Sequence, residues 1–383
     1  MGIGVNMKKI VKHMFYFLYY IYVSVKIPIV FKYANKFGKL KHLSKNECKA
    51  WEKGFLKMMQ EHCRSCFGFG SRLVYETFIN ADIEVVRQSP IEKKDTPVVV
   101  LSVKSDIHRL KMLVEHYRKL GVVKFAFIDN GSTDGTYEWM MEQSDIDLFK
   151  TNDKYNSLVK EGWLNRVVSY YGFGNWFILT DSDELFTYIG MEEHPIDELI
   201  RYAEANGIKR FKGINIDMYA DAPIFSMESD KIDIKETYCY MDTDSYIEQK
   251  RNIAGVEITA IIGGPRLRKL NVPISMMKYP LVYFSEGTIS ANAHYQYPYR
   301  LIEKSPLCVG ILHYKFLDSD KKEFERRANF SSGIAAGNSR SSGYYKQYID
   351  GAEKQMTFMY EGSVRFDSSK DLERIELIQK IKF

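Results

Sequence analysis

The residues of this chain best suited to chemistry follow one short apolar run. Residues 176–179 (Trp-Phe-Ile-Leu) predict a buried strand, and residues 181–184 read Asp-Ser-Asp-Glu. Three carboxylates within four residues repel one another, and Mg²⁺ or Mn²⁺, which prefer oxygen ligands, would relieve that repulsion. The sequence therefore predicts a divalent-metal site at the end of the strand. A solvated acidic turn is the alternative.

The elements that must position this turn form an alternating series. Apolar runs predict strands at 98–103, 123–128, 146–150 and 176–180, and apolar residues at helical spacing predict a helix between each pair. Such alternation produces right-handed crossovers and a mainly parallel sheet covered on both faces. We therefore predict an α/β fold with this series at its centre.

Three polar clusters follow strands of the series. They are residues 102–106, 129–134 and 181–184. Ligands of parallel sheets bind beyond the carboxyl ends of the strands, so we expect the clusters to line one edge and to bind a phosphate-bearing, metal-bridged substrate. The second cluster has neither the spacing of a calcium loop nor the GxGxxG pattern of dinucleotide-binding loops. An Asx turn that caps the next helix is its simpler interpretation.

Taken together, these segments resemble a known family. Val-Val-Leu-Ser-Val-Lys-Ser-Asp (99–106), Phe-Ile-Asp-Asn-Gly-Ser-Thr-Asp-Gly-Thr (127–136) and Trp-Phe-Ile-Leu-Thr-Asp-Ser-Asp-Glu-Leu-Phe (176–186) look like the family 2 glycosyltransferases of the GT-A fold. The similar branch carries a DNGSTDGT loop and a DxDE metal motif, and the family 92 transferases are related. The resemblance covers residues 98 to about 190.

The resemblance implies a metal-dependent glycosyltransferase in glycan or surface-polysaccharide assembly. Such an enzyme moves a sugar from a nucleotide-diphosphate sugar to a hydroxyl on a glycan or lipid-linked acceptor, with Mn²⁺ or Mg²⁺ as cofactor. In this family the implied nucleotide-binding residues are Ser102, Lys104, Asp129, Asn130 and Asp181. Asp181 and Asp183 would form the metal motif, with Asp183 on the cation that bridges the diphosphate and Glu184 orienting the motif.

Later residues complete this hypothesis. A predicted strand at 209–219 ends in Asp217 and Asp221, which are candidate bases for the acceptor hydroxyl. No Glu-Asp pair of the commoner family 2 form follows, which leaves the base and the stereochemistry open. His313 ends a strand-like run and is the preferred third metal ligand over His294. A structural strand histidine is the alternative.

Residues 1–45 form a basic, aromatic arm. Residues 1–46 contain nine lysines and no acid, whereas the remainder carries 45 basic and 49 acidic residues, which argues against a nucleic-acid surface on the body. The uncharged run 14–25 is shorter than the roughly 20 residues of a membrane span. Its tyrosines and flanking lysines predict association with an anionic membrane surface from the cytoplasmic side. A helix packed on the main domain is the alternative.

The overall composition indicates the class of protein and its redox environment. The 383 residues are 45% hydrophobic and 27% charged, as in folded soluble proteins, and five irregularly spaced cysteines favour a reducing cytoplasm over a disulfide framework. We predict a helical or irregular extension at 46–97, with a helix capped by Ser44 and then strand-like pieces and turns at 63–96. A GT-A catalytic domain follows at 98–320, and residues 321–383 form a lid and a capped amphipathic helix that begins at Ser368. Residues 263–268 (Gly-Gly-Pro-Arg-Leu-Arg) suit either an anion-binding turn or a hairpin with solvated arginines.

Two rival functions use the same residues differently. A nucleotidyltransferase would share the metal edge but needs a Gly- and Lys-rich first loop, and residues 102–106 contain no glycine. A catalytically silent, membrane-associated scaffold would be favoured by loss of Asp181 or Asp183, and both are present.

Overall fold

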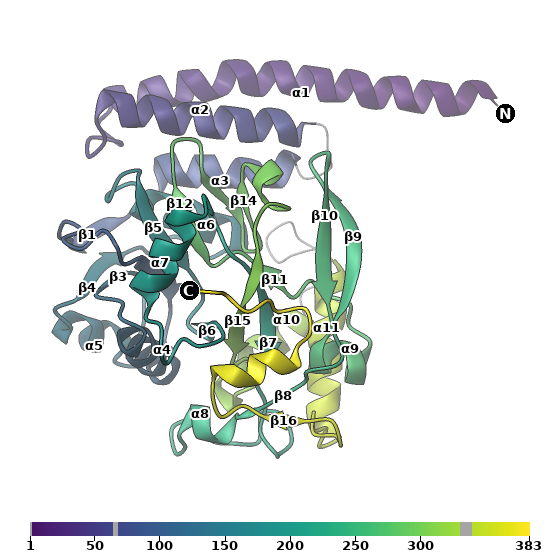
Figure 1. Ribbon diagram of the computed structural model, residues 1–383. Helices are drawn as coiled ribbons and strands as arrows, with labels where there is room; N and C mark the ends of the chain where they lie inside the picture. The colour runs from purple at the N-terminus through teal and green to yellow at the C-terminus, as the bar shows by residue number, and fades with distance from the viewer. Residues whose placement is uncertain (1, 64–67, 330–338) are drawn as a thin grey trace.

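The predicted alternating series forms a six-stranded sheet (Figure 1). The computed structural model describes residues 2–63, 68–329 and 339–383. The strand order is β1-β4-β3-β2-β5-β12, in which β4, β3, β2 and β5 are parallel and the outer two strands are antiparallel. The strands are β1 (Glu84–Arg87), β2 (Val98–Val103), β3 (Lys124–Asp129), β4 (Ile146–Lys150), β5 (Asn175–Leu179) and β12 (Leu281–Phe284). The prediction of an α/β fold with a mainly parallel central sheet is confirmed.

The connecting helices create a switch in strand order between β2 and β5. They are α4 (Ile107–Lys119), α5 (Thr136–Glu142) and α6 (Ser157–Val168). The chain moves outward from β2 to β3 to β4 and then crosses back, so that β5 pairs with β2 from the other side. The loop after β2 and the acidic turn after β5 therefore flank the point where ligands of such sheets collect.

A second sheet begins inside the acidic turn. Its order is β11-β7-β15-β6, with β7 and β15 parallel. The strands are β6 (Glu184–Thr187), β7 (Lys212–Asp217), β11 (Met277–Lys278) and β15 (Leu307–His313), and α7 (Ile196–Ala205) joins β6 to β7. Because β6 starts at Glu184, residues 180–183 are the direct link between the two sheets.

Smaller elements complete the body. They are α8 (Ile234–Thr237), β8 (Tyr240–Met241), β9 (Ile247–Ile253), β10 (Val256–Ile262), α9 (Gly264–Leu270), β13 (Ile289–Asn292), β14 (Tyr295–Tyr297), η1 (Tyr299–Leu301), η2 (Asp318–Asp320), α10 (Lys321–Ala328), α11 (Ser339–Glu353), β16 (Val364–Arg365) and η3 (Ser369–Arg374). β9 and β10 form a long antiparallel hairpin.

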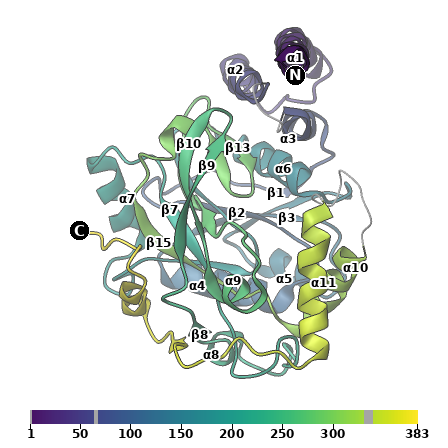
Figure 2. The same cartoon turned by 90° about the vertical axis from the view of Figure 1, so that its right-hand side faces the viewer.

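Three N-terminal helices lie in a stack on one side of the sheets (Figures 1 and 2). They are α1 (Gly2–Lys36), α2 (Lys45–His62) and α3 (Gly68–Asn80), and α1 is the outermost. The predicted cap of α2 is confirmed, since Ser44 and Glu47 form a capping box. Phe78 of α3 packs on Trp51 and Phe55 of α2, with ring centroids 4.8 and 5.0 Å apart. Burial of such rings ties the helices to the body.

The alternative prediction for the N-terminal arm, a helix packed on the main domain, is confirmed for one side of α1. Tyr19, Val23, Ile27, Phe31 and Ala34 form a buried stripe, defined here by these five residues, on the side of α1 that faces α2. The helix continues through Pro28 without a break, and its remaining faces are largely exposed. α1 also extends well past the end of α2 (Figure 1).

Three sequence-based expectations were wrong. Residues 68–80 form a helix rather than strand-like pieces, because Val74, Tyr75, Phe78 and Ile79 share one helical face that is buried. The expected C-terminal helix from Ser368 is only the short η3, after which Ile375 and Ile378 are buried from an irregular chain. Residues 263–268 open the short helix α9 instead of a hairpin. The core of the predicted lid, residues 330–338, lies outside the described residues, as does Cys66.

The close approach of α6 to α3 provides a test of this packing. A methyl group on Gly162 would lie 2.4 Å from Thr77 Cβ and 2.8 Å from the Val74 carbonyl oxygen. We expect Gly162→Ala to lower the free energy of unfolding by about 1 to 3 kcal/mol, as overpacking does. Urea unfolding followed by circular dichroism measures this change.

The matched control is the same substitution in α11. A methyl group on Gly343 would meet no atom within 4 Å. Gly343→Ala should leave stability unchanged or raise it by up to about 1 kcal/mol through helix propensity. Equal effects of the two substitutions would contradict the close contact.

Candidate functional site

The three predicted polar clusters meet at one edge of the large sheet. The backbone N–H of Ser105 donates to Ser132 Oγ at 2.9 Å, and that of Ile107 donates to Asp134 Oδ2 at 3.2 Å, which joins the loops after β2 and β3. Ser182 Oγ donates to the carboxylate of Asp106, which joins the loop after β2 to the acidic turn. The shared edge follows from the parallel strands and from the switch between β2 and β5.

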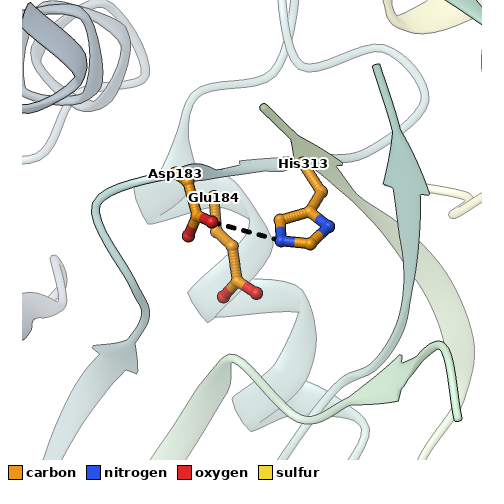
Figure 3. A group of neighbouring side chains, drawn as sticks. All are labelled: Asp183, Glu184 and His313. Atoms are coloured by element: carbon orange, nitrogen blue, oxygen red, sulfur yellow. Dashed lines mark ion pairs between the residues drawn. The ribbon is translucent and has the colours of Figure 1, made fainter. Parts of the chain in front are cut away.

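Strand register places a histidine and two acids in a row across the second sheet. His313, the last residue of β15, pairs with Glu184 of β6 on one side and with Asp217 of β7 on the other. Asp183 precedes Glu184, and its Oδ2 lies 3.3 Å from His313 Nε2 (Figure 3). One ligand atom from each of Asp183, Glu184 and His313 lies within 4.8 Å of the others. We call these three residues the metal-candidate trio.

The chemistry of the trio fits a divalent cation. His313 Nδ1 lies 2.8 Å from Asp217 Oδ1, so a neutral imidazole with its proton on Nδ1 would donate to Asp217 and offer the Nε2 lone pair to a cation. Carboxylates orient metal-binding histidines in this way. Two carboxylates and an imidazole are a donor set that suits Mn²⁺ better than the more oxygen-selective Mg²⁺. The Asp183 side chain is 17% exposed, so solvent reaches the group.

Asp181 is placed differently, because lysines hold both of its oxygens. Lys160 Nζ lies 2.7 Å from Oδ1 and Lys278 Nζ lies 3.0 Å from Oδ2. Lys278 also lies 2.5 Å from Glu184 Oε1, which accepts a further hydrogen bond from Asn215. The acids of the turn are therefore balanced by the chain's own cations. Their mutual repulsion does not by itself require a metal, which corrects the argument from the sequence.

The same contacts decide the ionisation of the turn. Burial alone would raise the pKa of Asp181, but the ammonium groups of Lys160 and Lys278 outweigh it and lower that pKa. Burial opposes ionisation of Asp183 as well, yet His313 holds the pKa of Asp183 well below its usual range. The pKa of His313 is raised, since Asp183 and Asp217 overcome its burial. Both aspartates thus stay ionised at neutral pH.

Asp217 is enclosed rather than open to an acceptor. Its side chain is fully buried, and Arg266 of α9 grips it with bonds of 2.6 and 2.8 Å. Arg268 makes a similar pair with Asp242, also buried. Both arginines of residues 263–268 are therefore engaged in internal ion pairs, although Arg268 stays 22% exposed, and these pairs replace both earlier interpretations of that segment.

The remaining predicted residues differ in their surroundings. Asp129 is buried and accepts from the N–H groups of Gly131 and Ser132, and Asn130 donates to the carbonyls of Thr151 and Asp153. Both side chains thus shape their own loop. Ser102 is half-buried and Lys104 and Asp221 are exposed. His294 lies 2.8 Å from the Met277 carbonyl oxygen, and burial lowers its pKa to about 4.

Sequence reasoning missed the cations of the site. Lys160 lies in a helix that is buried throughout residues 160–168, and Lys278 interrupts the apolar run 276–282. Arg109 is buried and binds Asp106 and Asp320 at once, with distances of 2.8 Å to each. A charged residue inside an otherwise apolar run is a signal that could have found Lys278, because lone charges are rarely buried without a partner, but α4 and α6 contain other charged residues and give no such signal for Arg109 or Lys160.

Two cavities differ in their relation to this edge. A small one beside Asp181 is lined by Lys160, Glu161, Lys278 and Ser290, among others, and Glu161 Oε1 has no hydrogen-bond partner. A larger cavity of about 360 Å³ lies between α4 and α8 and contains none of the predicted site residues. Position relative to the acids, rather than size, identifies the first as part of the site.

Comparisons with known proteins add little to this geometry. No family model matches the chain, and no curated protein sequence matches it. HddC from Yersinia pseudotuberculosis superposes on 68% of this chain and 98% of its own, with 13% identity and a TM-score of 0.25. S. aureus TarS 1–349 superposes on 66% of this chain and 69% of its own, with 12% identity and a TM-score of 0.26. Apo UDP-glucose pyrophosphorylase superposes on 74% of this chain and 96% of its own, with 7% identity and a TM-score of 0.27. At these TM-scores the superpositions carry no argument about this chain.

The buried pair of Asp217 and Arg266 is open to a direct test. Arg266→Met would leave a fully buried carboxylate with His313 as its remaining partner. We expect the free energy of unfolding to fall by about 3 to 5 kcal/mol, the cost of breaking a buried pair by removing one member. Chemical denaturation at pH 7 measures it.

Arg118→Met is the matched control. Arg118 grips Asp145 through two bonds of similar length, but its side chain is 41% exposed. Exposed pairs contribute at most about 1 kcal/mol. A loss as small for Arg266→Met as for Arg118→Met would show that Asp217 is not held as described.

Proposed function

We propose that this protein is a metal-dependent glycosyltransferase of GT-A type. It would take a sugar from a nucleotide-diphosphate sugar and transfer it to a hydroxyl of a glycan or lipid-linked acceptor. The observation that carries the proposal is the metal-candidate trio, placed at the switch between β2 and β5 and joined by Ser182 to the loop after β2. The motif resemblance of residues 98–190 supports the same assignment.

Each part of the edge has a role in this proposal. Asp183, Glu184 and His313 would hold Mn²⁺ or Mg²⁺, and Asp217 would orient His313. When bound, the cation would neutralise charge on the leaving diphosphate. Lys160 and Lys278 hold Asp181 in place, and Lys278 also pairs with Glu184. Asp129 and Asn130 would set the shape of the nucleoside loop, while Ser102 and Lys104 would contact the nucleotide from the neighbouring loop.

The two candidate bases are unequal. Asp217 has no exposed surface, and although its burial opposes ionisation, Arg266 and His313 lower its pKa. A carboxylate held in this way is a poor proton acceptor for a substrate hydroxyl. Asp221 is exposed, so an acceptor can reach it. We therefore assign the base to Asp221 and the orienting role to Asp217.

Asp183→Asn tests the proposal most directly. The protein is incubated with a panel of uridine, guanosine, adenosine and thymidine diphosphate sugars with and without Mn²⁺, and released nucleoside diphosphate is measured. We expect metal-stimulated release with at least one donor, lowered about 100-fold or more by Asp183→Asn, because metal stabilisation of the leaving group contributes several kcal/mol. The thermal shift caused by Mn²⁺ should also be lost.

Asp82→Asn serves as the control, since Asp82 is exposed in the loop that follows α3. It should change neither turnover nor the thermal shift. Release of pyrophosphate from a nucleoside triphosphate and a sugar phosphate would instead establish nucleotidyl transfer. No response to any nucleotide or to Mn²⁺, with Asp183→Asn behaving as the unchanged protein, would favour the scaffold.

A further inference from the structure

Helix α1 carries two apolar faces, and only one of them contacts the protein. The buried stripe packs on α2. The other, which we call the outward face, consists of Val11, Met14, Leu18, Ile21, Val25 and Ile29, with exposed fractions of 44% to 60%. Because an α-helix turns by about 100° per residue, these six positions lie opposite the buried stripe.

The outward face is long and continuous. From Val11 to Ile29 it extends for roughly 27 Å along the helix. Aromatic side chains flank it, and Phe15, Phe17, Tyr22 and Tyr33 are all more than 40% exposed. α1 is the outermost element of the molecule, so nothing in the described parts of the chain covers this face (Figure 2). Apolar patches of this extent mark a binding surface.

Charge identifies the partner. Residues 1–46 hold nine lysines and no acidic residue. Lys12 and Lys26 lie away from the outward face by the same helical geometry, and Lys26 pairs with Glu76 of α3 at 3.1 Å. An apolar face in a lysine-rich helix with tyrosines at its margins matches the boundary between acyl chains and anionic headgroups.

We propose that α1 binds the surface of an anionic lipid bilayer and lies in the plane of the interface. The outward face enters the boundary between headgroups and acyl chains, and the body of the protein remains on the aqueous side. This inference is independent of the proposed activity, since no part of it uses the metal-candidate trio.

The packing of α1 separates the in-plane arrangement from a membrane span. By length and composition the segment Ile10–Lys36 is able to cross a bilayer, with a mean hydropathy of 1.6. However, residues 19–34 of that segment lie against α2, which exposes Lys49, Lys53 and Lys57. Insertion of α1 across the hydrocarbon would carry these charges into it, which is strongly unfavourable. When α1 lies in the plane of the interface instead, α2 stays in water.

Charge also argues against a second copy of this chain as the partner. Two outward faces in contact would bring two lysine-rich segments together with no acid in either of them. Like charges at that distance repel, whereas an anionic surface attracts both the lysines and the apolar face.

Vesicle co-sedimentation of the full chain tests the proposal. Vesicles of phosphatidylcholine are compared with vesicles that also contain phosphatidylglycerol, at low and high salt. We expect binding to the anionic vesicles that weakens with salt. The double variant Leu18→Glu with Val25→Glu should bind at least about tenfold more weakly, because two apolar side chains no longer enter the bilayer.

Ile247→Glu is the matched control, because Ile247 is 55% exposed in the β9–β10 hairpin, away from α1. It should bind vesicles as the unchanged chain does. Unaltered unfolding midpoints show that both variants remain folded. Binding of the double variant equal to that of the unchanged chain, or no binding to either vesicle, would overturn the proposal.

Depth measurements separate the two orientations. Leu18→Cys and Val25→Cys, labelled with a polarity-sensitive dye, lie seven residues or about 10 Å apart along the helix. Cys48, Cys63, Cys239 and Cys308 are buried, and labelling of the unchanged chain gives the background. Equal, shallow quenching by lipid-borne quenchers supports the in-plane helix, and a depth difference near that spacing would establish a span instead. A vesicle-free dimer abolished by the double variant would assign the face to a second copy.

Discussion

The candidate site depends on buried charges that are matched one to another. The linked residues are Asp181 and Glu184 with Lys160 and Lys278, and Asp183 and Asp217 with His313 and Arg266. A buried charge without a partner costs several kcal/mol, so each residue holds its partner in place. Because the cations come from α6, α9, β11 and β15, the pairs that neutralise the acidic turn also fix how the two sheets meet.

These charge pairs distinguish Asp181, which the fold holds in place, from Asp183, which a cation could reach. Both oxygens of Asp181 are held by lysines, whereas Glu184 pairs with Lys278 through one oxygen and also belongs to the metal-candidate trio. Asp183 is partly exposed and faces one nitrogen of His313, whose other nitrogen is fixed by Asp217. A divalent cation would therefore be a ligand of a site that is already formed. Folding would not depend on the cation, whereas small zinc domains fold only when their metal is bound.

The sequence predicted what local pattern determines and missed what distant partners determine. The strands around residues 98–180 and their parallel order follow from apolar runs and short connections, and the meeting of the three loops follows from that order. The partners of Asp181 come from 21 and 97 positions away, and no spacing rule relates them to the turn. Arg266 looked like an anion-binding residue, since a sequence does not reveal that Asp217 faces it across the fold. The helix at 68–80 was hidden by aromatic and β-branched residues, which occur on buried helix faces as well as in strands.

The outward face of α1 has no explanation within the folded chain. Its side chains are exposed, so they contribute little burial to folding, and a polar outward face would serve the packing on α2 equally well. The buried stripe, in contrast, joins α1 rigidly to the core, where Phe31 packs against Phe55 and Phe78 with ring centroids 6.1 Å apart. A bilayer bound to the outward face would consequently be connected to the sheets through packed side chains rather than through a flexible tether. The orientation of the site relative to the membrane would then be fixed by the same aromatic contacts that hold the three N-terminal helices together.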